Sequence, residues 1–299
     1  MKLRSFLLLA RRLIIAALAT IFIWTVITML FEDKFIFFPT AYPGGIYEDA
    51  RFIRGLKDSM IVAEDGVRIH AWFAPADSAV ATLVMAHGNA GNISHRIEII
   101  RRLQNTGFNV LMFDYRGYGK SEGSPSEEGI YRDGRAAFDY AGMIPGVDPK
   151  KIFLWGTSLG GAVAVDVATQ RPAAGLILES SFSSARDVAR VAYPFLPVHL
   201  VLRTQLDSFE KIQRLRMPLL MMHGGRDSII PIELGKKLFN AANEPKEFYV
   251  IAEADHNNTF FVGGREYLEK SRDFVVKSTA PARPPVDDST RRAGWRKTK

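Results

Sequence analysis

The sequence predicts an α/β fold in which helices cover both faces of a mostly parallel sheet, preceded by one apolar N-terminal helix. Short apolar runs of strand length alternate along the chain with segments of helical spacing, and this alternation is typical of a parallel sheet covered on both faces. One of these runs leads directly into a glycine-rich turn and then into an alanine- and valine-rich segment. Near the N-terminus, residues 13–31 contain no charged side chain.

The uncharged run 13–31 has 19 residues, just enough for a helix rising ~1.5 Å per residue to cross a hydrocarbon core of ~30 Å. We therefore expect residues 1–34 to form a membrane anchor. A cleaved signal peptide is one alternative, because residues 17–19 (Ala-Leu-Ala) resemble a small-x-small cleavage site, although this site lies inside the apolar run. A buried core helix is the other alternative.

The charges that flank the apolar run predict its orientation. The run is preceded by Lys2, Arg4, Arg11 and Arg12, and it is followed by Glu32, Asp33 and Lys34. Lysine and arginine are enriched on the cytoplasmic side of membrane helices. We therefore expect a cytoplasmic N-terminus and a globular domain in the periplasm or otherwise outside the cytoplasm. The aromatic stretch 35–47 is expected to be a linker along the membrane interface.

The globular domain is expected to span residues 35–277. An antiparallel pair is predicted first, at 59–63 and 67–74, around an Asp-Gly turn. Apolar runs predict further strands at 82–86, 110–113, 151–155, 175–178, 218–222 and 248–251. Helical spacing predicts helices at 98–104, 130–141, 233–241 and 266–276. Residues 278–299 are rich in proline, arginine and polar residues, which predicts a disordered basic tail.

The net charge of +7 is concentrated at the two ends of the chain. Four basic residues precede the apolar run, and the tail 278–299 carries six basic residues against two aspartates. Because the domain between them is nearly neutral, we expect no nucleic-acid partner, and the basic ends are suited to setting topology or contacting membrane lipid. The chain has no cysteine, which excludes disulfide bonds, a thiol nucleophile and a cysteine zinc site.

The glycine-rich turn that follows the predicted strand 151–155 reads Gly-Thr-Ser-Leu-Gly at 156–160. In a G-x-S-x-G turn between strand and helix, the serine hydroxyl is exposed on a strained backbone, and small neighbours let the strand and helix approach each other. The helix N-terminus adds the backbone N–H of Leu159 for a developing oxyanion. An incidental serine in a plain turn is the alternative. We expect Ser158 to be a nucleophile.

A serine nucleophile needs a general base and an acid that orients the base. In this type of site the order along the chain is serine, acid, histidine. Of the six histidines, His256 is the one that follows both Ser158 and a suitable acid. Asp227, after the strand 218–222, is the expected acid, and Glu179, at the end of the preceding strand, is its rival. Asp255 adjoins the histidine directly, so its side chain is poorly directed for this role.

The second oxyanion donor is expected in the loop 87–92, His-Gly-Asn-Ala-Gly-Asn, after the strand 82–86. The backbone N–H of Asn89 is favoured, with Ala90 as the next candidate, and a plain glycine turn is the alternative. A phosphate-binding loop is disfavoured, because no Lys-Ser or Lys-Thr pair follows the glycines. The sequence contains no evident nicotinamide, flavin or metal site, so no cofactor is expected.

Five motifs occur together and in order: HGNAGN at 87–92, DYRGYG at 114–119, GTSLG at 156–160, HGGRD at 223–227 and DH at 255–256. With these motifs the chain resembles the α/β-hydrolases, and in particular the small single-pass members classed as serine-aminopeptidase-like (S33-type). The resemblance covers residues 35–277. It implies an α/β-hydrolase fold with a short lid insertion, a catalytic triad of Ser158, Asp227 and His256, and no cofactor.

The resemblance leaves several activities open, because this fold carries esterases, lipases, thioesterases and peptidases. We expect a serine hydrolase that forms an acyl-enzyme, acting as a carboxylester or thioester hydrolase on a small-molecule or lipid-like acyl substrate. A serine peptidase and a non-catalytic membrane-bound scaffold are the alternatives. The lid region 182–218 is short and apolar at 191–202, which fits either helix packing on the domain or an acyl-chain wall that faces the membrane.

Overall fold

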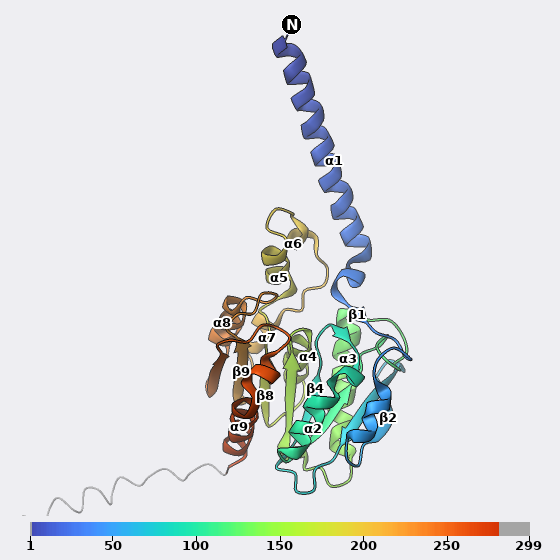
Figure 1. The fold of residues 1–299 in the computed structure, drawn as a ribbon, viewed down its shortest axis with the longest axis vertical. Coiled ribbons are helices and arrows are strands. Elements are labelled where there is room, and N and C mark those ends of the chain that lie inside the picture. The colour runs from blue at the N-terminus through green and yellow to red at the C-terminus, as the bar shows by residue number, and fades with distance from the viewer. Residues whose placement is uncertain (1, 281–299) are drawn as a thin grey trace, which may run out of the picture.

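The structure is a computed structural model that describes residues 2–280 (Figure 1). The predicted tail therefore lies outside the described residues from position 281 onward. A central sheet has the strand order β10-β9-β8-β7-β4-β6-β3-β2 within the described residues. Its strands are β2 (Lys57–Val62), β3 (Arg68–Ala74), β4 (Ala81–Ala86), β6 (Phe108–Phe113), β7 (Ile152–Thr157), β8 (Gly175–Glu179), β9 (Leu219–Gly224) and β10 (Lys246–Ile251).

The sheet is parallel from β10 to β6 and antiparallel where β3 joins it and pairs with β2. Its inner parallel strands β4, β6, β7, β8 and β9 are buried on both faces, whereas the edge strand β10 is only partly buried. Neighbouring residues of one inner strand enter different cores. Leu83 of β4 belongs to one apolar core and Val84 to the other, and both are almost fully buried. This double burial explains why the parallel strands are continuous apolar runs. The predicted fold class is confirmed.

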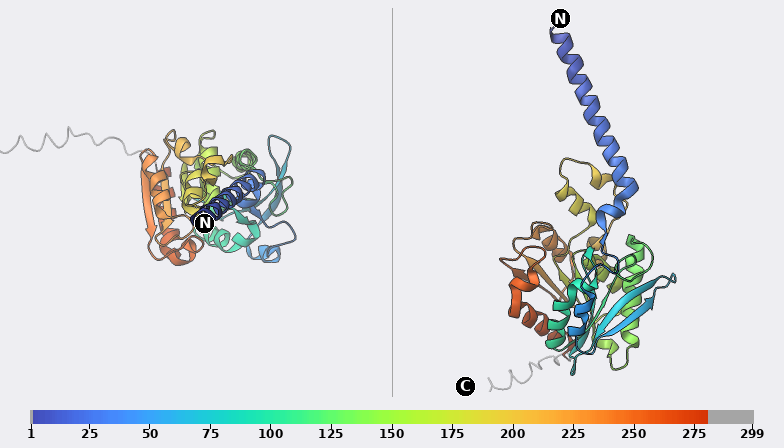
Figure 2. Two further views of the ribbon diagram at one scale, coloured as in Figure 1. Left: turned by 90° about the horizontal axis from the view of Figure 1, so that it is seen from above. Right: turned by 45° about the vertical axis from the view of Figure 1, so that its right-hand side comes forward.

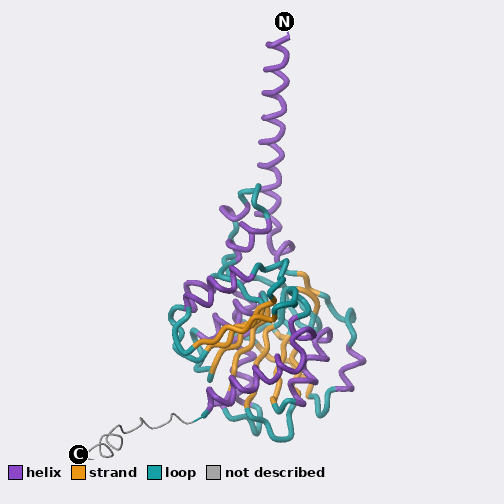
Figure 3. The backbone as a smooth tube through the Cα atoms, turned by 60° about the vertical axis from the view of Figure 1, so that its left-hand side comes forward, coloured by secondary structure: helices purple, strands orange, loops and turns teal. Residues whose placement is uncertain are grey.

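Helices cover both faces of the sheet (Figure 3). One face packs against α3 (Glu127–Met143), α4 (Leu159–Ala168) and α8 (Ile232–Ala241). The other face packs against α2 (Ile97–Asn105) and α9 (Thr259–Thr279). Because the intervening strands are parallel, their carboxyl ends meet at one edge of the sheet, where ligands bind in open α/β sheets.

The N-terminal helix α1 (Lys2–Ile36) leaves the domain at this carboxyl edge and points away from it (Figure 2). Its segment Arg4–Ile27 is long and apolar enough to cross a membrane, and the most apolar part of that segment is not buried in the protein. The helix is therefore not a core helix. It deviates from helical geometry at Phe31 (φ −122°, ψ 21°), and after this residue it contacts the domain.

The stretch after α1 is part of the domain, which corrects the expectation of an interfacial linker at 35–47. Strand β1 (Phe38–Pro39) pairs in parallel with β5 (Ala90–Gly91). The Phe37 side chain is buried in the core. Two interactions hold this segment on the domain. Its backbone forms hydrogen bonds with the loop that follows β4, and the Phe37 side chain packs among apolar residues of the core.

The lid lies between β8 and β9 and contains α5 (Ala185–Ala192), α6 (Val198–Val201) and α7 (Ser208–Ile212). Helices α5 and α6 rise above the carboxyl edge of the sheet, on the same side as α1 (Figure 1). Helix α6 contacts α1 directly. The lid and α1 are therefore neighbours in space, although about 160 residues separate them in sequence.

Candidate active site

Ser158 occupies the turn between β7 and α4, with backbone angles φ 53° and ψ −116°. A positive φ is strained for a residue with a side chain, and such strain persists where the surroundings enforce it. Here the Ser158 N–H donates to the Glu179 carbonyl at 2.8 Å, and the Ser158 carbonyl accepts from Gly161 N–H at 2.9 Å. A Cβ atom on Gly160 would overlap the Ala86 carbonyl oxygen. The small residues of the motif are therefore required by the close approach of α4 to β4.

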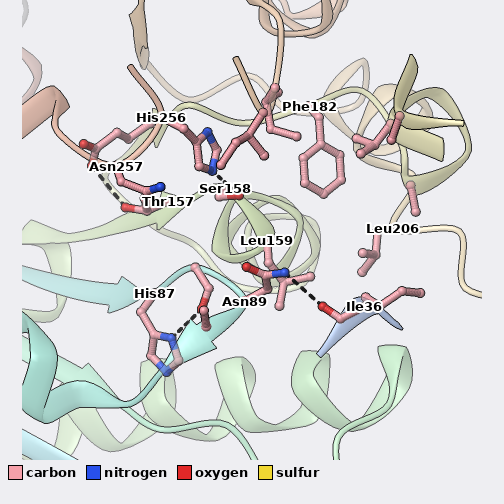
Figure 4. A pocket seen from close by; sticks show the side chains of 18 of the residues that line it. Ile36, His87, Asn89, Thr157, Ser158, Leu159, Phe182, Leu206, His256 and Asn257 are labelled. Carbon is pink, nitrogen blue, oxygen red and sulfur yellow. Dashed lines mark hydrogen bonds between the residues drawn. The ribbon is translucent and has the colours of Figure 1, made fainter. Parts of the chain in front are cut away.

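His256 lies between Ser158 and Asp227, and Figure 4 shows its ring beside Ser158. Its Nε2 is 3.0 Å from the Ser158 hydroxyl, and its Nδ1 is 2.8 Å from Oδ2 of Asp227. The other carboxylate oxygen of Asp227 accepts from the backbone N–H groups of Ile229 at 3.1 Å and Ile230 at 2.7 Å. A carboxylate accepts the Nδ1 proton, which leaves Nε2 free to take a proton from the serine.

A second histidine, His223, packs against the acid and helps to hold its turn. Its Nε2 donates to the Ile230 carbonyl at 2.9 Å and lies 3.4 Å from Oδ2 of Asp227. Burial lowers the pKa of His223, so its ring stays neutral near pH 7. A neutral donor beside Asp227 leaves the negative charge of that carboxylate available to His256.

Glu179, the rival acid, makes no hydrogen bond or ion pair with His256, and its carboxylate accepts hydrogen bonds from other side chains. It is buried, and its Oε2 accepts from Trp155 Nε1 at 3.3 Å, Thr157 Oγ1 at 3.0 Å and Tyr267 OH at 2.8 Å. Its Oε1 accepts from the hydroxyl of Thr259, which begins α9 just after the histidine loop. The carboxylate therefore joins β7, α9 and the histidine loop beneath the serine.

Asp255 is also turned away from the imidazole of its neighbour. Its Oδ1 accepts from the backbone N–H of Ser228 at 2.8 Å and from the backbone N–H of His256 at 2.7 Å. These hydrogen bonds lower the pKa of Asp255 and tie the histidine loop to the loop that carries Asp227. The structure thus separates three nearby acids into one that faces the imidazole and two that hold the surrounding loops.

The predicted oxyanion loop lies beside the serine. A Cβ atom on Gly88 would be 3.7 Å from the Ser158 Cβ. The His87 Nδ1 donates to the Gly88 carbonyl at 2.7 Å, and the Asn89 carbonyl accepts from Tyr118 OH at 2.8 Å. These hydrogen bonds hold the loop in place. In the described part of the chain, the backbone N–H groups of Asn89 and Leu159 donate to no acceptor.

A buried carboxylate that sequence reasoning did not assign supports this loop from below. Asp114, at the end of β6, accepts from Ile93 N–H at 2.8 Å and lies 3.4 Å from His87 Nε2 and 3.5 Å from His70 Nδ1. Burial opposes ionisation of Asp114, but the two imidazoles and the N–H donor outweigh it, and its pKa lies below the ordinary value. The family motif at 114–119 was the signal in the sequence for this position.

A cavity of about 850 Å³ opens above the serine and contains Ser158, His256 and Asn89 in its wall. Much of the remaining wall is apolar, and it comes mainly from the lid, the start of α9 and the C-terminal third of α1, with further residues from β4 and its loop and from the loop after β9. Phe182 and Leu206 of the lid face the serine across this space (Figure 4). Sequence reasoning did not anticipate the contribution of α1. Among the described residues, no group of three acidic or histidine side chains is arranged to hold a metal ion.

Comparison with known proteins places the chain in a family. Residues 77–206 match the family described as serine aminopeptidase, S33. The α/β-hydrolase domain-containing protein WAV2 of Arabidopsis thaliana is 32% identical over 274 residues, which cover 83% of this chain and 88% of that protein. The chain belongs to the α/β-hydrolase family.

Two further matches agree with this α/β-hydrolase assignment. The lysophosphatidylserine lipase ABHD12 of Danio rerio is 34% identical over 190 residues, covering 56% of this chain and 49% of that protein. The solved structure of the Pyrococcus furiosus esterase Pf2001 superposes with a TM-score of 0.67 and 22% identity, covering 82% of this chain and 98% of that one. The family expected from the motifs is confirmed, and the protein is a serine hydrolase enzyme.

Proposed function

We propose that this α/β-hydrolase cleaves carboxylesters or thioesters of acyl-bearing substrates, with Ser158, His256 and Asp227 as its catalytic triad. The observation that carries the proposal is the hydrogen-bonded chain from Asp227 through His256 to the serine hydroxyl, at 2.8 and 3.0 Å. A serine hydroxyl becomes an effective nucleophile when a base within hydrogen-bond reach removes its proton. The strained backbone of the serine, at φ 53°, further supports a functional role.

The reaction follows from this arrangement. Ser158 Oγ attacks the acyl carbon while its proton passes to Nε2 of His256, and Asp227 stabilises the imidazolium. The backbone N–H groups of Asn89 and Leu159 bind the oxyanion. The imidazolium then protonates the departing alcohol or thiol, leaving an acyl-serine. His256 next takes a proton from water, the hydroxide attacks the acyl carbon, and the acid leaves as Ser158 recovers its proton.

The acidic side chains that line the cavity are already engaged with other groups of the protein, which favours an ester or thioester substrate over an aminopeptidase substrate. An aminopeptidase would need a free carboxylate to bind the α-ammonium group of a peptide. Among the described residues that line the cavity, Glu32 and Glu179 already accept several hydrogen bonds each, and Glu98 pairs with Arg101 and Arg102. The apolar remainder of the wall suits a hydrocarbon chain. The similarity to a lysophosphatidylserine lipase supports the same substrate class.

We further infer that residues 1–34 anchor the enzyme with its N-terminus in the cytoplasm and its domain, 35–277, on the other side. The basic residues before the apolar segment support this orientation. Fusions at the C-terminus test it: alkaline phosphatase should be active and a fluorescent protein that matures only in the cytoplasm should stay dark. A fluorescent fusion together with an inactive phosphatase fusion would show the opposite orientation, and it would not affect the proposed enzymatic activity.

The substrate class is tested with two panels of chromogenic compounds on the full-length protein in detergent. One panel contains nitrophenyl esters of increasing acyl length, and the other contains aminoacyl nitroanilides. We expect ester hydrolysis that rises with acyl length and is abolished by Ser158→Ala, with little turnover of the anilides. Faster hydrolysis of the anilides would favour the peptidase. Absence of turnover in both panels would favour a scaffold without catalysis.

A further inference from the structure

Glu32, near the end of α1, is a buried carboxylate held by the lid. It is 3% exposed, and its two oxygens accept from the backbone N–H groups of Arg203 and Thr204, both at 3.0 Å, and from the Thr204 hydroxyl at 2.9 Å. These donors lie immediately after α6, 171 and 172 residues away in sequence. Hydrogen bonds to a buried charged group are strong, and their loss leaves the donors unpaired. These hydrogen bonds thus join the membrane-crossing helix to the lid segment that follows α6.

The same end of α1 is fastened to the oxyanion loop. The Ile36 carbonyl accepts from the side-chain amide of Asn89 at 3.0 Å (Figure 4), and Phe38 N–H donates to the Asn89 carbonyl at 3.0 Å. The pairing of β1 with β5 continues this contact. The last turn of α1 therefore bridges the lid and the loop that faces the serine, and its position is set by both.

The cavity above the serine extends upward along α1 beyond this bridge. Its wall includes Trp24 and Thr25, which lie inside the segment Arg4–Ile27 that can cross a membrane. Trp24 precedes Glu32 by eight positions, which places it ~12 Å further along the helix. Apolar residues of the lid, including Leu196 and Val198, line the same cavity, and α6 contacts α1. The cavity therefore reaches the C-terminal end of the membrane-crossing segment, the end nearest the domain.

The tip of the lid presents apolar side chains on the same side of the molecule. Phe195 is 94% exposed and Leu200 is 69% exposed, and Tyr193 next to them is half exposed. Large exposed apolar groups grouped beside a membrane helix are suited to the interface between water and lipid. Because α6 contacts α1, a lid tip immersed in this interface would bring the upper end of the cavity to the acyl chains of the bilayer.

We propose that the substrate is a lipid resident in the bilayer, and that its acyl chain enters the cavity directly from the membrane between α1 and α6. In this arrangement α1 is one wall of the acyl-binding site, and Glu32 keeps that wall against the lid. The inference rests on the proposed hydrolase activity and adds the source and route of its substrate. An acyl chain that enters in this way exchanges one apolar surrounding for another and never crosses water.

The test compares Glu32→Gln with Asp33→Asn in the full-length protein reconstituted into phosphatidylcholine vesicles. Asp33 is the matched control, because it is exposed and adjacent, and its side chain makes no hydrogen bond or ion pair among the described residues. Each variant is assayed with water-soluble nitrophenyl acetate and with methylumbelliferyl palmitate embedded in the vesicle. Thermal unfolding checks that the variants are folded.

We expect Glu32→Gln to lower kcat/KM for the embedded palmitate at least about tenfold more than kcat/KM for acetate, with Asp33→Asn unchanged for both. Equal loss for both substrates, or no loss for either, would overturn the proposed entry route. If the wild type hydrolyses neither substrate, the hydrolase proposal itself fails, which is a different result.

The lid side of the contact provides a second, milder variant. Thr204→Val removes one of the donors to Glu32 and keeps the shape of the residue. We expect it to lower palmitate turnover selectively and by less than Glu32→Gln. The double variant should lose no more than Glu32→Gln alone, because both changes break one contact. Additive effects, or a loss of acetate turnover alone, would show that the two residues do not act together on chain entry.

Discussion

Nδ1 of His256 lies 2.8 Å from Oδ2 of Asp227, while the acid adjacent to the histidine in sequence, Asp255, accepts hydrogen bonds from Ser228 instead. The acid next to His256 in sequence is thus not the hydrogen-bond partner of its imidazole. The carboxylate that reaches the imidazole comes from the loop that follows a different strand. The parallel sheet brings the two loops together at its carboxyl edge. This relationship leads to the first prediction.

Asp227→Asn should reduce kcat for a soluble nitrophenyl ester by roughly 10⁴-fold, by analogy with the serine-protease triad, because an amide does not hold the imidazole in the required tautomer. The thermal unfolding temperature should change little in comparison. The measurement is steady-state kinetics on purified protein. Retention of more than about a tenth of the wild-type kcat would contradict the role of Asp227.

Glu179→Gln should act mainly on stability. Its carboxylate accepts four hydrogen bonds from buried donors, including Tyr267 OH at 2.8 Å and the Thr259 hydroxyl. A glutamine places an N–H₂ group against such donors, and we expect a loss of roughly 1.5–3 kcal/mol in the free energy of unfolding. The pH dependence of kcat in the folded variant should match that of the wild type. A shifted pH profile with unchanged stability would assign Glu179 to the reaction instead.

Gly160→Ala should prevent correct folding or abolish activity. Gly160 lies at the start of α4, and a Cβ atom there would overlap the carbonyl oxygen of Ala86 at the end of β4. Gly142→Ala is the matched control within α3, where the new Cβ atom would meet no heavy atom closer than 3.9 Å. That control should stabilise the helix by about 0.5–1 kcal/mol. Thermal unfolding of the two variants checks the contrast, and equal stability would remove the packing argument for the motif glycine.

Asp114→Asn should destabilise the protein at neutral pH and less so in acid. The folded-state pKa of Asp114 is depressed, so its ionised form contributes stability above the unfolded-state pKa of ~3.9, and this contribution is lost as the pH falls through the folded value. We expect a loss of roughly 1.5–3 kcal/mol near neutral pH that narrows below about pH 4. Denaturant unfolding across pH measures it. Asp77→Asn is the control, because among residues 2–280 the Asp77 side chain forms only an exposed ion pair with Arg54.

The sequence predicted the elements whose signals are local. The serine turn could be found because its residues form a contiguous G-x-S-x-G motif between a strand and a helix, and the order of the motifs pointed to His256 and Asp227. The inner parallel strands could be found because both of their faces are buried, which makes them continuous apolar runs. The structure brings the three predicted side chains together, while their roles remain the proposal made above.

The contacts that the sequence did not predict join distant segments. Glu32 was interpreted only as a charge that flanks the apolar run, because nothing in its neighbourhood indicates donors 171 residues away. The stretch 35–47 was expected to be a linker, because its pairing partner at 90–91 belongs to a loop with no strand pattern. Asp114 belongs to the motif at 114–119, but its role could not be predicted from the sequence. Its contacts with His70 and His87 depend on how β3, β4 and β6 are ordered in the sheet.

The central claim is that Ser158 is the nucleophile, and covalent labelling tests it most directly. Purified full-length protein is treated with a fluorophosphonate, and its intact mass and labelled peptide are measured by mass spectrometry. The account predicts one adduct on the wild type, located on Ser158 beside Nε2 of His256, and no adduct on Ser158→Ala. Labelling of Ser158→Ala to the same extent as the wild type, or an adduct on any other residue, would contradict it.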